Sequence, residues 1–204
     1  MENNEQRGNL IVIYGINTLG KTTQAKLLVE SLILKIGKNA EYLKYAVYDL
    51  APSGPLINSY LKQGNPHKFS AREFQFLQIL NRTQYEPKLK EKLNKGTWII
   101  AEDYTGSGIA WGMAEGIDKE LLYNMNSHLR KEDLGILFEG EPFAAKMDKK
   151  NIHETDSQKL AKAATAYKEI ARDFGWHVVD ANQTVEEVQE NIIQIINSKL
   201  TTLN

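Results

Sequence analysis

The sequence of 204 residues contains no cysteine, and this absence excludes three kinds of chemistry. Without cysteine there can be no disulfide framework, no thiolate metal site and no cysteine nucleophile. The four histidines do not provide a metal site in place of cysteine, because no two of them have the spacing of metal ligands. We therefore expect neither a disulfide-stabilised secreted fold nor a metal site built on histidine.

The sequence also lacks a charge excess and a long apolar run. It has 25 Lys and Arg against 26 Asp and Glu, so no basic field favours a nucleic acid or a membrane surface. No segment approaches the ~20 apolar residues of a membrane span, and the polar residues 1–7 lack the apolar centre of a signal peptide. These features predict a cytoplasmic protein that binds small molecules, with no nucleic-acid or membrane partner.

No internal repeat, low-complexity tract or Gly/Ser linker divides the chain. Its length fits a flexible tail at residues 1–8 and one domain at residues 9–204. Short apolar runs alternate with amphipathic stretches, a pattern typical of an α/β fold with a parallel sheet between helices. Five strands are expected, at Leu10–Tyr14, Ala40–Tyr48, Thr97–Ala101, Leu134–Phe138 and His177–Val179.

Four helical segments are expected between and after these strands. One follows the first strand and ends at Gly37, and the next two cover Pro55–Leu61 and roughly Ala71–Leu93. A fourth begins after Thr184, which forms a capping box with Glu187.

The long helix at residues 71–93 presents two kinds of side chain. Gln78, Arg82 and Tyr85 fall on one stripe, which either lines a cleft or forms a solvated face. Its apolar positions are expected in the core, namely Phe76, Leu77, Leu80, Leu89 and Leu93.

The most informative segment is Gly-Ile-Asn-Thr-Leu-Gly-Lys-Thr-Thr at residues 15–23. Its spacing G-x-x-x-x-G-K-[ST], between a strand and a helix, predicts a phosphate-binding P-loop rather than a simple connecting turn. Lys21 is expected to reach the β- and γ-phosphates of ATP, and the Thr22 hydroxyl to ligate Mg²⁺. The predicted ATP contacts are Gly15, Asn17, Thr18, Leu19, Gly20, Lys21, Thr22 and Thr23.

Acidic residues follow two other predicted strands. Glu102 and Asp103 directly follow the third strand, and since consecutive residues of an extended chain face opposite ways we expect only Glu102 to face the metal. The alternative is that one caps a helix and the other is a surface charge. Asp49 follows the second strand and is either a general base or a turn residue.

The polar segment at about residues 146–158 is expected to be a lid. It offers Lys146, Lys149 and Lys150, and Lys149 is the predicted catalytic cation that neutralises charge during phosphoryl transfer. The alternative is an exposed lysine-rich loop that only aids solubility.

The chain resembles the thymidylate kinase family of nucleoside monophosphate kinases over nearly its whole length. The resemblance rests on Ile11–Leu28, residues 54–61, Leu80-Asn81-Arg82, residues 106–110 and residues 179–188. It implies a three-layer P-loop NTPase fold with a lid, Mg·ATP-dependent conversion of dTMP to dTDP, and a homodimer. It also implies a nucleotide contact at Asn182, and substrate contacts at Gln78, Arg82, Tyr85, Asp103, Tyr104 and Ser107.

The chain departs from the family pattern at several positions. Arginines expected to grip the acceptor phosphate correspond to Asp49 and Asp103, and acidic positions correspond to Tyr14 and Asn17. A base-stacking aromatic corresponds to Gln78, and a glutamine corresponds to Gly112, which follows Ala110-Trp111.

Three functions are consistent with this pattern. The first is a kinase of dTMP or a related nucleotide, with phosphate-binding arginines drawn from elsewhere, such as Arg72 or Arg130. The second is a kinase of a nucleoside or other neutral alcohol with Asp49 as base. The third is a nucleotide-binding protein without kinase activity.

Overall fold

The computed structural model of the chain describes residues 7–142 and 156–200. Five strands and seven helices occur in this described part. In chain order they are β1 (Leu10–Tyr14), α1 (Lys21–Ile36), β2 (Ala40–Lys44), α2 (Ser53–Lys62), α3 (Ala71–Asn94), β3 (Trp98–Glu102), α4 (Thr105–Ala114), α5 (Lys119–Asn126), β4 (Leu134–Glu139), α6 (Ser157–Phe174), β5 (His177–Asp180) and α7 (Val185–Lys199).

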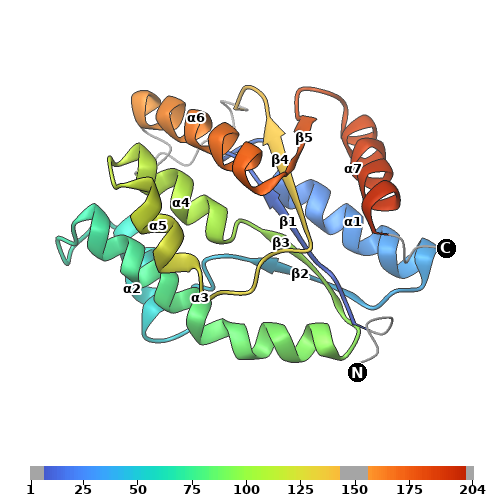
Figure 1. Cartoon of the computed structure of the whole chain (residues 1–204), viewed down its shortest axis with the longest axis horizontal. Coiled ribbons are helices and arrows are strands. Elements are labelled where there is room, and N and C mark those ends of the chain that lie inside the picture. The colour runs from blue at the N-terminus through green and yellow to red at the C-terminus, as the bar shows by residue number, and fades with distance from the viewer. Residues whose placement is uncertain (1–6, 143–155, 201–204) are drawn as a thin grey trace.

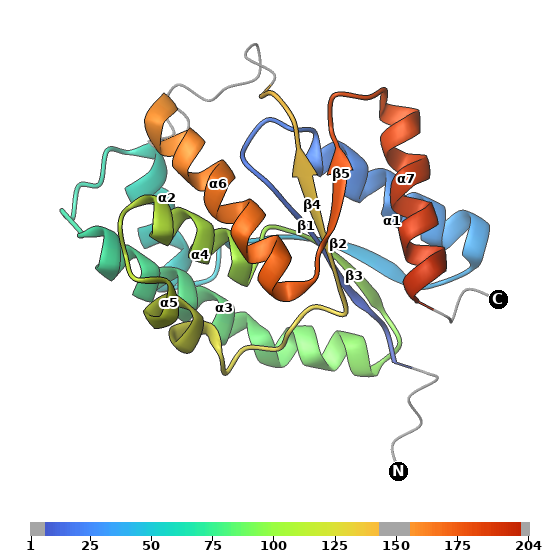
Figure 2. The same ribbon diagram turned by 45° about the horizontal axis from the view of Figure 1, so that its top comes forward.

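All five strands are parallel and form one sheet in the order β2-β3-β1-β4-β5. Helices α1 and α7 pack on one face of this sheet, and α3, α4 and α6 cover the other (Figures 1 and 2). The predicted three-layer α/β fold with a five-stranded parallel sheet is therefore confirmed. In such sheets ligands bind outside the carboxyl ends of the strands.

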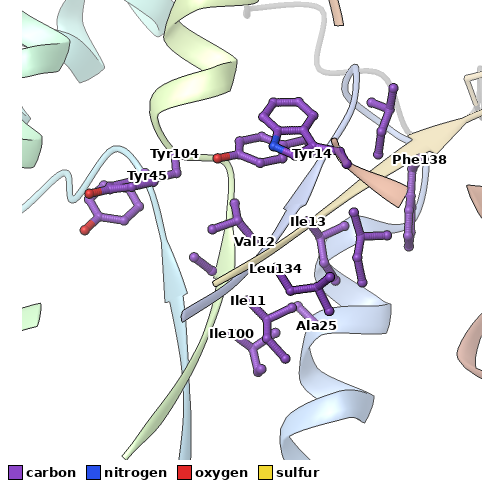
Figure 3. Close-up of a cluster of buried hydrophobic side chains, with 14 of the residues drawn as sticks. Ile11, Val12, Ile13, Tyr14, Ala25, Tyr45, Ile100, Tyr104, Leu134 and Phe138 are labelled. Carbon is purple, nitrogen blue, oxygen red and sulfur yellow. The ribbon is translucent and has the colours of Figure 1, made fainter. Parts of the chain in front are cut away.

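The core is centred on β1, whose five residues are fully buried. Figure 3 shows side chains of β1 among apolar groups from β3, β4 and α1. Burial on both faces explains why β1 has a continuous apolar sequence instead of the alternation of a half-exposed strand. The rigid central strand ends at Tyr14, where the P-loop begins.

Four of the five predicted strands agree with the structure within one residue at each end, whereas β2 ends at Lys44 instead of Tyr48. The partner strand β3 ends at the same point, since Glu102 is its last residue and pairs with Lys44, and further on a side chain of α3 bonds the backbone. The Asn81 side chain accepts a hydrogen bond from Val47 N at 2.8 Å and donates one to Val47 O at 2.9 Å. These backbone groups are therefore occupied by a side chain and cannot continue the ladder with β3.

The predicted helix boundaries are largely confirmed. Gly37 ends α1 with φ 68°, and its N–H donates to Leu32 O. The capping box of Thr184 and Glu187 opens α7. Helices α4, α5 and α6 were not predicted as separate elements.

The predicted core positions of α3 are only partly correct. Leu89 and Leu93 are buried and Leu77 is partly buried, but Phe76 is 55% exposed and Leu80 is 42% exposed. The first half of α3 packs against α2 and α4, and its outer side is partly exposed. Both exposed side chains lie on that outer side.

Two predicted segments fall mostly outside the described residues. Of the expected tail at residues 1–8 only Arg7 and Gly8 are described, and Gly8 is buried with its N–H donating to Leu93 O at 2.8 Å. Of the expected lid, residues 156–158 are described. Asp156 caps α6 by accepting from the N–H groups of Gln158 and Lys159. No helix in the described ranges is long and apolar enough to span a membrane.

Candidate active site

The P-loop lies between β1 and α1 and has the backbone geometry that its glycines permit. Gly15 has φ 135° and Gly20 has φ 83°, which are conformations that other L-residues rarely adopt. A Cβ atom at Gly15 would also lie 2.7 Å from Phe138 O on β4. Gly20 directly precedes α1, so the positive end of the helix dipole and its free N–H groups face an incoming phosphate.

Lys21 sits at the centre of the loop and is only 4% exposed. Its ammonium donates to Gly15 O at 2.7 Å and Ile16 O at 2.8 Å. Its Nζ also lies 3.8 Å from Asp103 Oδ1. The loop thus wraps around one buried positive charge, as expected for a polyphosphate cradle.

A cavity of about 380 Å³ extends from the P-loop across the ends of β2 and β3 to α3. It joins the predicted ATP-binding loop to the polar stripe of the long helix. Its walls are formed by Asn17, Thr18, Gly20, Lys21, Thr22, Thr23, Lys44, Tyr45, Ala46, Tyr48, Ile57, Leu61, Lys62, Gln78, Arg82, Glu102, Asp103, Ser107 and Trp111.

Most predicted site residues meet in this cavity. The predicted residues among its walls are Asn17, Thr18, Gly20, Lys21, Thr22, Thr23, Gln78, Arg82, Glu102, Asp103 and Ser107. Six others do not line it, namely Gly15, Leu19, Asp49, Tyr85, Tyr104 and Asn182. Lys146, Lys149 and Lys150 lie outside the described residues.

Glu102 is the most heavily hydrogen-bonded acid in the cavity and is 4% exposed. Its Oε2 accepts from Thr22 Oγ1 at 2.6 Å and from the Tyr42 hydroxyl at 2.7 Å, and its Oε1 accepts from Lys44 Nζ at 2.7 Å. Although burial opposes ionisation, Lys21 and Lys44 hold the pKa of Glu102 below its ordinary value. Glu102 is therefore a buried carboxylate that is both ionised and fixed in place.

Asp103 also lines the cavity, so both acids reach it, and which of them faces the metal stays a prediction. The alternation of a strand does not apply, because Asp103 follows the end of β3 and has φ 61°. It accepts from Ser107 Oγ at 2.8 Å. Burial raises its pKa despite the opposing effect of Lys21.

Arg82 reaches the cavity from α3 and is 4% exposed. Its Nη2 donates to Gln78 Oε1 at 3.0 Å, while Nε and Nη1 have no hydrogen-bond partner among the described residues. Burial lowers the pKa of the guanidinium, which stays charged because its ordinary value is so high. A buried, incompletely paired guanidinium points to an acceptor group supplied by a ligand.

Two glycines of α4 leave space for their neighbours. A Cβ at Gly108 would lie 2.7 Å from Arg82 Nη1, so the absence of a side chain there lets the guanidinium pass. A Cβ at Gly112 would lie 2.8 Å from Leu122 Cδ2, which explains why the glutamine of the family pattern is not accommodated.

Tyr85 and Tyr104 are not among the cavity walls, and their contact with the substrate stays a prediction. Both are buried and pack against Tyr45, with ring centroids 6.0 Å and 4.9 Å away respectively. Tyr45 does line the cavity. The three rings form one aromatic cluster, of which only Tyr45 reaches the cavity.

Asp49 is exposed, lies in a turn and is outside the cavity walls, which agrees with the alternative of a turn residue. A place at the cavity was expected from a longer second strand, but β2 ends at Lys44 and not at Tyr48. Lys44, not Asp49, is the charged residue that the second strand delivers to the cavity.

Asn182 lies on an exposed loop after β5, away from the cavity walls. Its Oδ1 accepts from the N–H of Glu141 at 3.0 Å, which ties the loops after β4 and β5 together. Its contact with the nucleotide stays a prediction.

Neither alternative arginine reaches the cavity. Arg72 is exposed in the first turn of α3. Arg130 donates from Nη2 to both carboxylate oxygens of Asp133, at 2.6 and 2.8 Å, and lines a different cavity. Tyr14, at the expected acidic position, fills the core and stacks on Trp176 with ring centroids 3.8 Å apart.

Several cavity residues were not predicted from the sequence, chiefly Lys44, Lys62 and Trp111. Lys44 could have been found by alternation along the predicted second strand, which places it on the same side as Tyr42. No short motif marks Lys62 or Trp111, since they reach the cavity through the packing of α2 and α4.

Comparison with known proteins identifies the family. A family model described as Thymidylate kinase matches residues 13–192. The thymidylate kinase of Danio rerio is 30% identical over 92% of this chain and 89% of its own length, and that of Schizosaccharomyces pombe is 29% identical over 95% and 94%. A solved thymidylate kinase from Candida albicans superposes with a TM-score of 0.77 at 26% identity, covering 96% of this chain and 94% of its own. Together with the P-loop fold and its cavity, these matches establish that the chain belongs to the thymidylate kinase family and is a nucleoside monophosphate kinase.

Proposed function

We propose that this chain transfers the γ-phosphoryl group of Mg·ATP to dTMP or a closely related nucleoside monophosphate, which yields ADP and the nucleoside diphosphate. The observation that carries this proposal is the single cavity that joins Lys21 of the P-loop to the buried guanidinium of Arg82. A phosphate donor at one end and a nucleotide acceptor at the other would meet within it. Holding both reactants in line supplies much of the acceleration in phosphoryl transfer.

The donor side rests on the P-loop. The N–H groups at the start of α1 and the Lys21 ammonium would replace water around the β- and γ-phosphates. Lys21 now bonds two carbonyl oxygens of the same loop, and would exchange these for phosphate oxygens by a small movement of its end.

The residues beside the P-loop fit a magnesium ion. The Thr22 hydroxyl and the Glu102 carboxylate are hard oxygen groups joined by a 2.6 Å hydrogen bond, and Glu102 would hold the ion directly or through water. Mg²⁺ is commonly held by one or two protein oxygens together with phosphates and water. The proposed metal residues are accordingly Thr22 and Glu102. When bound, the ion supplies positive charge that offsets the charge developing on the β- and γ-oxygens.

The acceptor side favours an anionic nucleotide. The cavity walls contain four cationic side chains, Lys21, Lys44, Lys62 and Arg82, against the two acids Glu102 and Asp103. This excess offers the positive charge that was expected from arginines elsewhere. Arg82 and Gln78 would hydrogen-bond the acceptor from α3, and Lys44 and Lys62 would attract its phosphate.

The neutral-acceptor alternative loses its base, since Asp49 lies outside the cavity. Asp103 is inside, but it is close to Lys21 and accepts a hydrogen bond from Ser107. No described acid in the cavity is thus free of a cationic or hydrogen-bonding neighbour. We therefore rank a nucleotide acceptor first.

ADP release with a panel of acceptors tests the proposal. The panel consists of dTMP, dUMP, thymidine, other deoxynucleosides and no acceptor, each with Mg·ATP. We expect turnover with dTMP at ordinary kinase rates of roughly 1–100 s⁻¹. Turnover with thymidine alone would favour the neutral-acceptor kinase, and retained ATP binding without any turnover would favour a non-catalytic binding protein.

A homodimer is proposed on the outer side of α3. Phe76 and Leu80 lie one helical turn apart and are 55% and 42% exposed, so they form an apolar pair that a second copy would cover. We also propose that Lys149 supplies the catalytic cation expected from the lid segment, and that the protein is cytoplasmic, as its composition predicts.

A further inference from the structure

Three side chains hold the carboxylate of Glu102, and one of them, Tyr42, has no assigned role. The Tyr42 hydroxyl and Thr22 Oγ1 both bond Glu102 Oε2, at 2.7 and 2.6 Å, while Lys44 bonds the other oxygen. An ionised carboxylate can only accept hydrogen bonds, so both hydroxyl groups must point their hydrogens at Oε2.

The register of the sheet explains why Tyr42 reaches Glu102. Parallel pairing sets Lys44 beside Glu102 and Tyr42 beside Ile100. Side chains two residues apart on a strand project from the same face, so Tyr42 and Lys44 approach the carboxylate from one side of the sheet. The Tyr42 ring is held in addition by Lys26, whose Nζ lies 5.7 Å from the ring centroid.

The orientation of Thr22 depends on this arrangement. A threonine hydroxyl has one hydrogen and two acceptor lone pairs. If its hydrogen is donated to Oε2, its lone pairs are left for a cation. A Glu102 carboxylate that rotated would release that hydrogen and change the direction of the lone pairs.

We propose that Tyr42 is a positioning residue for the metal site: its hydroxyl fixes Oε2 of Glu102, which in turn fixes the Thr22 hydroxyl with its lone pairs toward the ion. This inference rests on the proposed function, in which Thr22 and Glu102 hold Mg²⁺. Lys44 is less suited to fixing the carboxylate, because its side chain is 45% exposed and its ammonium is carried on a long flexible stem. Tyr42 has only two rotatable bonds and a half-buried ring.

The test is the affinity of the metal, measured on full-length protein by electron paramagnetic resonance of Mn²⁺ in the presence of ADP. Tyr42→Phe keeps the ring and removes only the hydroxyl. Partners behind metal ligands typically contribute 10–100-fold to metal affinity, so we expect the Tyr42→Phe variant to bind Mn²⁺ at least about 10-fold more weakly. ADP affinity in excess chelator should stay within about 2-fold of wild type, because no phosphate contact is lost.

A matched control is available on another part of the molecule. The Tyr123 hydroxyl also donates to a carboxylate, that of Asp173, at the same distance of 2.7 Å. Tyr123→Phe therefore removes an equivalent hydrogen bond away from the cavity and should leave Mn²⁺ affinity unchanged. An equal loss in both variants would show a general effect on stability and would overturn the proposal.

Glu102→Gln separates this inference from the proposed metal site. If Glu102→Gln leaves Mn²⁺ affinity unchanged, the assignment of the metal to Thr22 and Glu102 is wrong. If Glu102→Gln weakens Mn²⁺ binding while Tyr42→Phe binds as tightly as wild type, the site stands and the positioning role of Tyr42 is refuted.

Discussion

Lys44 on β2 and Glu102 on β3 are direct neighbours in the parallel register, and the Lys44 ammonium lies 2.7 Å from Glu102 Oε1. The pair connects the second strand to the P-loop, because Glu102 also accepts from Thr22. The Glu102 carboxylate raises the pKa of Lys44 although burial of the ammonium opposes it. Each partner thus keeps the other charged within the cavity.

A double-mutant cycle with Lys44→Met and Glu102→Gln measures this coupling. Either single variant removes one charge and leaves the other less well paired, whereas the double variant removes both charges. Contacting charged pairs typically couple by 0.5–3 kcal/mol, and the partial exposure of Lys44 favours the lower half, about 0.5–1.5 kcal/mol. The measurement is urea unfolding of the four proteins. Strict additivity of the two single changes would contradict a coupled pair.

Gly108→Ala tests the role of Arg82 without altering Arg82 itself. The added methyl group would lie 2.7 Å from Nη1 and 2.8 Å from Nη2, so the guanidinium must move. We expect the KM for dTMP to rise about 10-fold or more while the KM for ATP changes little. Steady-state kinetics with each substrate varied in turn provides both values.

The control for this variant is Gly112→Ala, one helical turn further along α4. Its methyl group would meet Leu122 and not Arg82. It should lower stability through tight packing and leave the KM for dTMP nearly unchanged. If both variants raise that KM alike, the effect comes from a shift of α4 as a whole.

The stability of the protein should depend on pH through Glu132. This residue accepts from Trp176 Nε1 at 2.7 Å, and burial raises the pKa of its carboxyl above the ordinary value. The folded state therefore binds the proton more tightly than the unfolded chain, and stability falls as pH rises from the unfolded pKa through the folded one. Glu132→Gln cannot ionise, but it keeps an acceptor for Trp176.

We expect the Glu132→Gln variant to gain stability relative to wild type as pH rises from about 4, by up to about 1.4 kcal/mol per pH unit until the folded pKa is passed. Denaturant unfolding at pH values between 4 and 8 measures the difference. A stability difference that is constant with pH would contradict this account of Glu132.

The outer side of α3 should carry the dimer contact. Replacing both Phe76 and Leu80 with serine removes the exposed apolar pair, so sedimentation equilibrium should show a shift from dimer to monomer. The control is Leu34→Ser on α1, which is 81% exposed in the opposite layer and should leave the assembly unchanged. A monomeric wild-type protein would refute the dimer, and a dimer that tolerates both serines would place the contact elsewhere.

The fold could be predicted from local patterns because those patterns follow from physical requirements of the backbone. The continuous apolar run of β1 reflects burial on both faces, and the conformations of Gly15 and Gly20 follow from the P-loop turn. The end of β2 could not be predicted, since β3 also ends opposite Lys44 and the backbone beyond it bonds Asn81, which is 34 residues from Val47 in sequence. Such competition between a side chain and a strand is visible only in three dimensions.

The donor side of the site could be predicted because its residues are contiguous in sequence. The acceptor side was predictable only in part, since Arg82 and Gln78 were expected from the polar stripe of the long helix, whereas Lys44 and Lys62 reach the cavity from two other elements. Alignment of Asp49 with an expected arginine suggested a negative charge at the end of the second strand, whereas the structure has Lys44 there. The excess of cations in the cavity appears only once these elements are packed.

Formation of labelled dTDP is the most direct test of the central claim. The protein is incubated with Mg²⁺, dTMP and ATP labelled in the γ-phosphate, and the nucleotides are separated. The account predicts that the label appears in dTDP at roughly 1–100 s⁻¹ and that Lys21→Ala abolishes this transfer. Label released only as inorganic phosphate, or full activity of the Lys21→Ala variant, would contradict it.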